Sequence, residues 1–221
     1  MDTKMEKMIE NHTFIAGITG SGKTVFASDQ FSRSHRLAIF INTNNEVIPE
    51  QKADIVFHDV EGFCTAINKY KTKRLCLSPT MEHDITITDI NNIIQILFEM
   101  GYKINENKTE PLIWCEIYID EIQEYQGKMG KAPYITRIWK RGRRYGIIGI
   151  AMSQRPADVS HTVLTQSKTH YIFDMGQYEK GYFESYGIPV FEPEYMEWLR
   201  NDYHYLKYEK GEVTKHEPIT I

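Results

Sequence analysis

The stretch TFIAGITGSGKTVFASDQF, residues 13–31, decides the fold. It opens on an apolar run typical of a buried strand, and residues 17–24 then fit the pattern G-x-x-x-x-G-K-[ST] without a mismatch before a helix-compatible segment. Glycines in such a loop let successive backbone N–H groups converge on phosphate oxygens, and the positive end of the following helix points at the same place. We therefore predict that this loop binds the phosphates of a nucleotide.

Two side chains of the loop have specific expected roles. Lys23 would reach the β- and γ-phosphates of ATP, and Thr24 would offer its hydroxyl to Mg²⁺. The expected nucleotide contacts are Thr19, Gly20, Ser21, Gly22, Lys23, Thr24 and Val25.

Short β-rich runs alternate with helical patterns along the rest of the chain. The predicted strands cover 13–18, 37–42, 54–59, 74–79, 112–120, 146–153 and 169–175, and the predicted helices cover 23–34, 60–71, 88–102, 131–145 and 178–186. This alternation favours an α/β fold with a mostly parallel sheet, and the continuous apolar character of the strands favours helices on both faces. A polar surface loop is expected at 103–111 and a C-terminal β-hairpin at 203–218.

Composition and charge narrow the class of protein. The 221 residues carry a net charge of −4, so no overall basic field indicates a nucleic-acid partner, which leaves only a local patch for that role. Three cysteines without C-x-x-C spacing favour a reducing cytosol, and scattered histidines predict no zinc site. We find no signal-peptide pattern and no apolar run near the ~20 residues that span a bilayer. A soluble cytoplasmic protein of one domain, residues 1–221, is expected.

A second motif, IYIDE at 117–121, ends a predicted buried strand on an acidic pair. Ligands of open α/β sheets bind at the carboxyl ends of strands, so Asp120 is expected to hold the Mg²⁺ and Glu121 to orient or deprotonate an attacking water. A GTPase would show N-K-x-D for guanine, and NKYK at 68–71 lacks the Asp. A small-molecule kinase needs no glutamate beside the metal-binding Asp. The pair therefore favours an ATPase, in which water is the acceptor.

The segment KMGKAPYITRIWKRGRR, residues 128–144, carries seven basic residues and no acidic one. It leads directly into a predicted core strand that ends at Ser153-Gln154. A basic helix of this kind could place a guanidinium at a subunit boundary, where an arginine that reaches a neighbour's γ-phosphate contributes ~10³–10⁵ in rate. The Gln154 amide could hydrogen-bond both a γ-phosphate oxygen and the attacking water.

These motifs together resemble the FtsK–HerA superfamily of hexameric DNA-pumping ATPases. GITGSGKT and IYIDE contribute to the resemblance, and GRRYGIIGIAMSQRPADVSHTVLTQSKTHYIFDM, residues 142–175, is its most specific part. The resemblance covers roughly 12–176, which we take as the core, and leaves 177–221 as a helical and hairpin extension. It implies a RecA-like core, ATP at the subunit interfaces of a homo-oligomeric ring, most simply a hexamer, and double-stranded DNA threaded through that ring.

The same resemblance implies roles for individual residues. Arg143 would be the arginine that acts on the neighbouring subunit's ATP, with Arg141 and Arg144 as competitors for that role. Gln154 would sense the γ-phosphate. Lys128 and Lys131 are the candidates for contacts with DNA phosphates, and ordinary surface lysines are an equally good interpretation of them.

The short chain departs from the cellular members of that superfamily. We expect it to lack the N-terminal barrel of the cellular HerA branch and the membrane segments and DNA-reading winged helix of FtsK. Its layout is therefore similar to that of the genome-packaging ATPases of membrane-containing icosahedral viruses. A viral packaging motor, located in the host cytoplasm or at a virion vertex with capsid partners, is the leading expectation. Two alternatives stay open: a conjugative, plasmid or filamentous-phage assembly ATPase, and a nucleotide-gated binding module that pumps nothing.

Overall fold

The fold was analysed in a computed structural model, which describes residues 9–126 and 134–219. The strands are β1 (Thr13–Ala16), β2 (Leu37–Ile41), β3 (Ile55–Phe57), β4 (Arg74–Leu77), β5 (Cys115–Ile119), β6 (Ile147–Ser153), β7 (Thr169–Ile172), β8 (Tyr205–Glu209) and β9 (Glu212–His216). The α-helices are α1 (Lys23–Ser32), α2 (Val47–Lys52), α3 (Val60–Lys69), α4 (Ile87–Asn105), α5 (Ile135–Arg141), α6 (His161–Gln166), α7 (Gln177–Ser185) and α8 (Pro193–Leu199). Three 3₁₀ turns, η1 (Ile122–Tyr125), η2 (Gly142–Tyr145) and η3 (Pro156–Asp158), complete the described elements.

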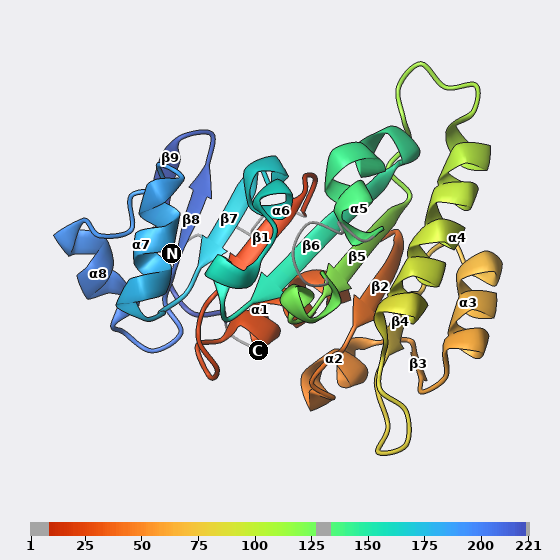
Figure 1. Cartoon of the computed structure of the whole chain (residues 1–221), viewed down its shortest axis with the longest axis horizontal. Coiled ribbons are helices and arrows are strands. Elements are labelled where there is room, and N and C mark those ends of the chain that lie inside the picture. Colours follow the sequence, from red (N-terminus) through yellow and green to blue (C-terminus); the bar gives the residue numbers. More distant parts are fainter. Residues whose placement is uncertain (1–8, 127–133, 220–221) are drawn as a thin grey trace.

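All of these strands form one nine-stranded sheet in the order β3-β4-β2-β5-β6-β1-β7-β8-β9 (Figure 1). The seven strands from β3 to β7 run parallel, and the hairpin β8–β9 is added antiparallel to β7. The predicted α/β fold with a mostly parallel sheet and a C-terminal hairpin is confirmed. Because β6 lies between β1 and β5, the loops after these three strands are neighbours at one edge of the sheet.

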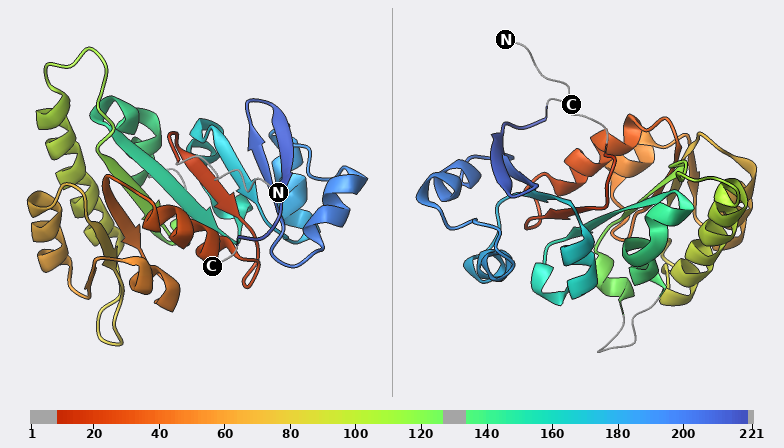
Figure 2. Two further views of the ribbon diagram at one scale, coloured as in Figure 1. Left: turned by 180° about the vertical axis from the view of Figure 1, so that it is seen from behind. Right: turned by 90° about the horizontal axis from the view of Figure 1, so that it is seen from above.

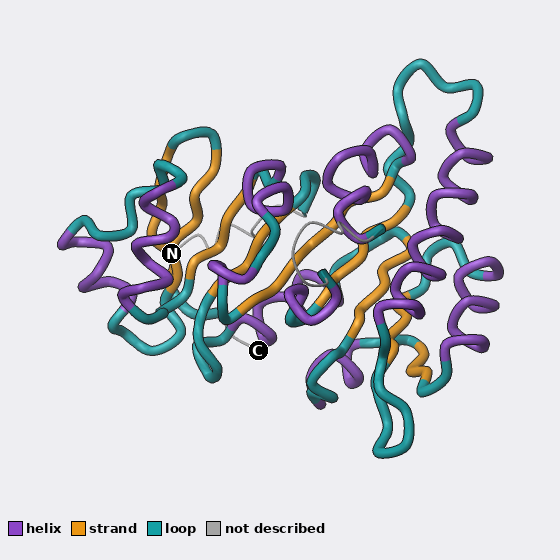
Figure 3. The backbone as a smooth tube through the Cα atoms, viewed as in Figure 1, coloured by secondary structure: helices purple, strands orange, loops and turns teal. Residues whose placement is uncertain are grey.

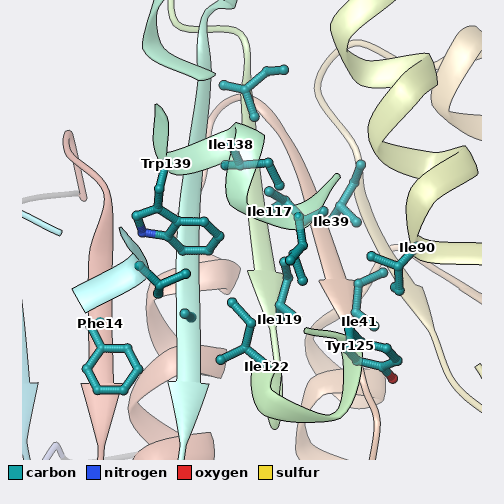
Figure 4. Close-up of a cluster of buried hydrophobic side chains, with 14 of the residues drawn as sticks. Phe14, Ile39, Ile41, Ile90, Ile117, Ile119, Ile122, Tyr125, Ile138 and Trp139 are labelled. Atoms are coloured by element: carbon teal, nitrogen blue, oxygen red, sulfur yellow. The ribbon is translucent and has the colours of Figure 1, made fainter. Parts of the chain in front are cut away.

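The two faces of the sheet are covered unequally. One apolar cluster joins the sheet to α3–α8, whereas the opposite face is covered mainly by α1, through Phe26, Ala27 and Phe31 (Figure 2). Figure 4 shows the larger cluster, in which Ile117 and Ile119 of β5 pack between Ile138 of α5 and Tyr125 of η1. Burial on both faces explains why the central strands have continuous apolar sequences.

Several predicted boundaries shift in the structure. The predicted helix 88–102 extends to 87–105, because a capping box between Thr86 and Asp89 starts it and three residues of the expected loop 103–111 continue it. The basic helix expected at 131–145 is α5 followed by a 3₁₀ turn, and its residues 131–133 lie outside the described residues. The short helices α2, α6 and α8 were not predicted, because six or seven residues carry too little periodicity.

The parallel arrangement gives the sheet two chemically different edges. The carboxyl ends of β1, β5 and β6 lie at one edge, as the arrows in Figure 1 indicate, and the amino end of β6, joined to α5 and η2, lies at the other. Figure 3 traces the backbone in the same view and separates strands, helices and loops by colour. At ~3.3 Å per residue, the seven residues of β6 separate the two edges by roughly 20 Å. In the part of the chain that the structure describes, no helix is long and apolar enough to cross a membrane.

Candidate nucleotide-binding and hydrolysis site

The loop between β1 and α1 has the geometry of a phosphate cradle. Gly20 and Gly22 have φ values of 79° and 101°, a left-handed conformation that glycine adopts without steric cost. A side chain at Gly17 would collide with Ser21 and Phe173, at 2.5 and 2.6 Å from its Cβ. The sequence thus places glycines where the backbone must curl back on itself, and α1 begins at Lys23 directly behind the curl.

Backbone hydrogen bonds from neighbouring strands hold the loop in place. Gly17 donates its N–H to the Ser153 carbonyl at 3.3 Å, and Ile18 donates to the Asp174 carbonyl at 2.9 Å. The Asp174 carboxylate is in turn paired with the buried amine of Lys180 at 3.1 Å. Two sheet neighbours of β1 therefore anchor the loop on either side.

Lys23 lies in the middle of this cradle. Its side chain is buried, and its Nζ donates to the Ile18 carbonyl at 3.3 Å, so that the amine points back into the loop. Burial lowers the pKa of Lys23, while the nearby Glu121 and Asp120 carboxylates oppose that effect. The charges of the acidic pair therefore act on the lysine of the phosphate loop.

Asp120 directly follows β5, and it is buried. Its backbone N–H donates to Ile41 at 3.1 Å, its carbonyl accepts from the Thr43 hydroxyl at 2.6 Å, and its Oδ2 accepts from Asn44 at 3.3 Å. Burial first, and the Glu121 carboxylate second, raise the pKa of Asp120 to about 7. The surrounding groups offset little of the cost of burying this negative charge, so the Asp120 carboxylate is suited to binding a cation.

Glu121 has a backbone conformation that residues other than glycine rarely adopt. Its φ of 43° and ψ of 55° are left-handed, a strain of about 1–3 kcal/mol that is concentrated at functional sites. Gln123 donates to its Oε2 at 2.6 Å, and the Gln154 backbone N–H donates to the same oxygen at 3.3 Å. Among the described residues no donor contacts Oε1, so this oxygen can accept a hydrogen from a water.

Gln154 bridges the acidic pair and the phosphate loop. Its backbone bonds to Glu121, and its side-chain Oε1 accepts from the Thr19 hydroxyl at 2.8 Å. The chain Thr19–Gln154–Glu121 therefore joins three predicted site residues from three different segments. The arrangement requires β6 to lie between β1 and β5, a strand order that the sequence did not reveal.

The residues present fit a Mg²⁺ ion that is held partly by nucleotide phosphates. Asp120 supplies a buried carboxylate next to the loop that carries Thr24. Over residues 9–126 and 134–219 no cluster of three or more His, Cys, Asp or Glu side chains is arranged for a metal. Mg²⁺ in nucleotide sites is usually bound through one or two protein ligands plus phosphates and waters, a set to which Asp120 and Thr24 could contribute.

Sequence analysis missed one contributing segment, INTNNE at 41–46. Thr43 and Asn44 contact Asp120, and Glu46 acts on Lys23 through its charge. The signal was available, because this polar run follows the strand LAIFI at the same carboxyl edge as Asp120. The run was overlooked because it has no acidic pair of the kind formed by Asp120 and Glu121.

The described basic residues of segment 140–144 lie at the opposite edge of the sheet. Arg141, Arg143 and Arg144 are exposed and, together with Lys140 and Lys168, border a cavity of about 220 Å³ over His12 and Trp139. None of the three arginines forms an ion pair with a residue that the structure describes. Their own subunit's phosphate loop lies at the far end of β6, so they cannot serve it. Lys128 and Lys131 lie outside the described residues.

The fold and the phosphate loop of this chain are those of the P-loop NTPase class. The chain is similar to the genome packaging NTPase B204 from Sulfolobus turreted icosahedral virus 2, with ATP-gammaS bound, at 17% identity and a TM-score of 0.68 over 95% of this chain and 98% of that one. B204 from Sulfolobus turreted icosahedral virus, a DNA-packaging ATPase, gives 17% identity and a TM-score of 0.63 over 95% and 98%. ATPases 2 and 3 of EssC from Geobacillus thermodenitrificans give 14% identity and 0.54 over 93% and 39%.

The structural similarity agrees with the resemblance found in the sequence and confirms the expected fold. No protein-family model and no curated protein matches the sequence. At these identities the likeness concerns the fold, and the roles of individual residues rest on the geometry described above.

Proposed function

We propose that this chain hydrolyses ATP to move double-stranded DNA, as the packaging motor of a viral genome. The observation that supports this function is that different functional groups lie at the two ends of β6. One end places Gln154 between the phosphate loop and Glu121, and the other end follows three arginines that have no ion-pair partner among the described residues. A motor needs both a site that hydrolyses and a group that acts on the next subunit's site.

Hydrolysis follows from the hydrogen bonds at the carboxyl edge. The backbone N–H groups of the loop and Lys23 would hold the phosphates, and Thr24 with Asp120 would hold Mg²⁺, which neutralises charge on the β- and γ-phosphates. Glu121 would accept a proton from the attacking water at Oε1, because both of its donors already occupy Oε2. Gln154 would respond to the γ-phosphate through Thr19, to which its side chain bonds.

The unpaired arginines support assembly into a ring. Arg143 would reach the γ-phosphate of the adjacent subunit, where it stabilises charge in the transition state. Such a head-to-tail interface closes into a ring when its rotation permits, and we propose a hexamer. Arg141 and Arg144 flank Arg143 at the same edge and remain candidates for the same role.

Transport of DNA is supported by the similarity to B204, named as a genome packaging NTPase, and by no direct contact in this chain. Lys128 and Lys131 would contact DNA phosphates in the ring's pore, in a way that does not depend on sequence and weakens with salt. Capsid or virion-vertex proteins would anchor the motor. A conjugative, plasmid or filamentous-phage assembly role would use the same ATPase site with a different cargo.

The test is a steady-state ATPase measurement with and without linear duplex DNA, at two salt concentrations. Stimulation by duplex that weakens at higher salt supports the proposal, as does displacement of a third strand from a triplex substrate. Lys23→Ala should abolish ATP binding and turnover, whereas Lys103→Ala, an exposed lysine on α4, should change neither. ATP hydrolysis without any response to DNA would contradict the DNA-motor function, and negligible turnover in all conditions would favour the binding module.

A further inference from the structure

An apolar cavity of about 350 Å³ adjoins the phosphate loop on the thinly covered face of the sheet. Its lining residues come from α1, from the end of β7 and from the C-terminal extension: Gly22, Val25, Phe26, Phe173, Tyr203, Tyr205, Pro218 and Ile219. The volume lies at the small end of the ~300–1,000 Å³ of ligand sites, so it suits one part of a nucleotide. Gly22 belongs both to this cavity and to the phosphate loop, which makes the two sites continuous.

The floor of the cavity is a rigid aromatic cluster. The Tyr205 ring stacks on Phe173 at 5.0 Å between centroids and meets the edge of Phe26 at 5.1 Å, and all three side chains are almost fully buried. Such a floor supplies a flat apolar surface without losing side-chain entropy when a ligand binds.

Tyr203 is the unusual member of the lining. Its backbone φ is 63°, which is left-handed and uncommon for a bulky residue, and its ring is 55% exposed. The ring lies over the phosphate loop, since a Cβ built on Gly22 would lie 3.2 Å from Tyr203 Cδ1. Glycine or asparagine would adopt this left-handed backbone conformation with less strain than tyrosine. We therefore attribute the tyrosine at this position to the contacts that its ring can make.

The chemistry of the lining limits what it can recognise. Among the described residues that line the cavity, no side chain is charged and only Tyr203 and Tyr205 carry a hydroxyl. An aromatic base could be buried and stacked here, but few side-chain groups could read its hydrogen-bonding edge. Strong rejection of a wrong ligand requires buried polar groups that it leaves unpaired, and these are scarce in this cavity.

We propose that this cavity holds the base of the nucleotide whose phosphates occupy the loop, with Tyr203 stacked on the base and with weak discrimination between purines. The proposal rests on the proposed nucleotide binding. It gives the C-terminal extension a role in the site, because Tyr203, Tyr205, Pro218 and Ile219 all come from it.

The test measures the affinity of the full chain for ATP, GTP and inorganic tripolyphosphate, which has the phosphates but no base. Stacking on an aromatic side chain contributes ~1–3 kcal/mol per base, so Tyr203→Ala should weaken ATP binding about 5- to 150-fold. The same substitution should leave tripolyphosphate affinity unchanged, and Tyr203→Phe should retain ATP affinity. Wild-type protein should bind ATP and GTP within about tenfold of each other.

A matched control is Tyr102→Ala on α4, because Tyr102 is also 55% exposed and lies outside the cavity. It should change no affinity. The inference is overturned if Tyr203→Ala binds ATP like wild type, or if it loses ATP and tripolyphosphate equally, which would indicate damage to the loop itself. A large preference for one purine would overturn the weak discrimination. Wild-type protein that binds neither ATP nor tripolyphosphate would instead overturn nucleotide binding, and this inference with it.

Discussion

The two ends of β6 differ in how completely the chain satisfies its own polar groups. At the carboxyl end, Gln154, Glu121 and Thr19 are joined by hydrogen bonds of 2.8 and 3.3 Å. At the amino end, Arg141, Arg143 and Arg144 are exposed and have no ion-pair partner among the described residues. The polar groups at the carboxyl end are hydrogen-bonded to one another within one subunit. The arginines at the amino end have no acidic partner among the described residues.

The contrast indicates which functions one subunit can perform. A hydrolytic site that is held by internal hydrogen bonds is ready before any partner arrives, which limits the reorganisation needed during catalysis. A cluster of unpaired cations is costly to assemble because like charges repel, and an anion from outside relieves that cost. The following four experiments test the contrast, from the largest expected effect to the smallest.

Arg143→Ala tests the amino end most directly. If this arginine acts on the neighbour's γ-phosphate, kcat should fall by ~10³–10⁵ while ATP binding is retained. Mixing this variant with Glu121→Gln protein should restore activity, because about a quarter of the interfaces in an equal mixture then join an intact Glu121 to an intact Arg143. Activity is measured against the mixing ratio.

Two kinds of control accompany this mixture. Arg33→Ala, which removes a surface pair with Asp29, should have little effect on kcat. A larger loss in Arg141→Ala or Arg144→Ala than in Arg143→Ala would reassign the role to that residue. Absence of any recovery on mixing would argue against an active site shared between subunits.

Glu121→Gln tests the carboxyl end within one subunit. Removing a general base typically costs ~10²–10⁴ in rate, and the amide keeps the shape of the side chain, so ATP should still bind. Single-turnover hydrolysis and equilibrium ATP binding distinguish the two effects. Glu124, an exposed glutamate in the 3₁₀ turn that follows Glu121, provides the matched control, and Glu124→Gln should hydrolyse ATP at the wild-type rate.

Gln154→Ala removes the side chain that links the phosphate loop to the acidic pair. Loss of one positioned hydrogen-bond donor at a developing charge typically costs ~10²–10³ in kcat. Thr19→Val, which deletes the partner hydroxyl, should produce a smaller loss in the same direction. Gln95→Ala on α4, where the amide bonds only to the exposed Glu99, should leave kcat unchanged, and equal losses in all three variants would contradict the linkage.

His12→Asn tests the positive charge of the amino end through stability. His12 accepts a hydrogen bond from the Gly149 N–H at 3.0 Å, and burial, then Arg143 and Lys168, lower its pKa to about 4. The unfolded chain binds a proton at this histidine at about pH 6.5, so the contribution of His12 to the free energy of unfolding should fall as the pH drops from about 6.5 to about 4. For His12 alone the loss is about 3 kcal/mol.

Asparagine at position 12 keeps an acceptor but does not titrate, so the variant should show a shallower pH dependence of denaturant unfolding over this range. His170, whose pKa burial also lowers to about 4, would add to this dependence, whereas Asp120, whose pKa is raised to about 7, would oppose it in both proteins. His83→Asn, an exposed histidine, should unfold with the wild-type pH profile. An unchanged slope in His12→Asn would show that burial and the neighbouring cations do not lower the pKa of His12 in the folded chain.

Much of the site was predictable because its motifs are local. Gly20, Gly22 and Lys23 are close in sequence, and their conformations and contacts follow from that spacing. Asp120 and Glu121 were recognisable because they follow a continuous apolar strand. The helix boundaries at 88–102 and 131–145 were less accurate, because capping and 3₁₀ geometry depend on a few hydrogen bonds rather than on periodicity.

The sequence by itself determined the phosphate loop, the acidic pair and the α/β class, since each depends on neighbouring residues and on apolar patterns. Only the tertiary structure decided that β6 inserts between β1 and β5, which brings Thr19, Gln154 and Glu121 into one hydrogen-bonded chain. It alone also placed Tyr203 over Gly22, about 180 residues away in sequence. Strand order and long-range contacts depend on the packing of the whole sheet, and no local pattern encodes them.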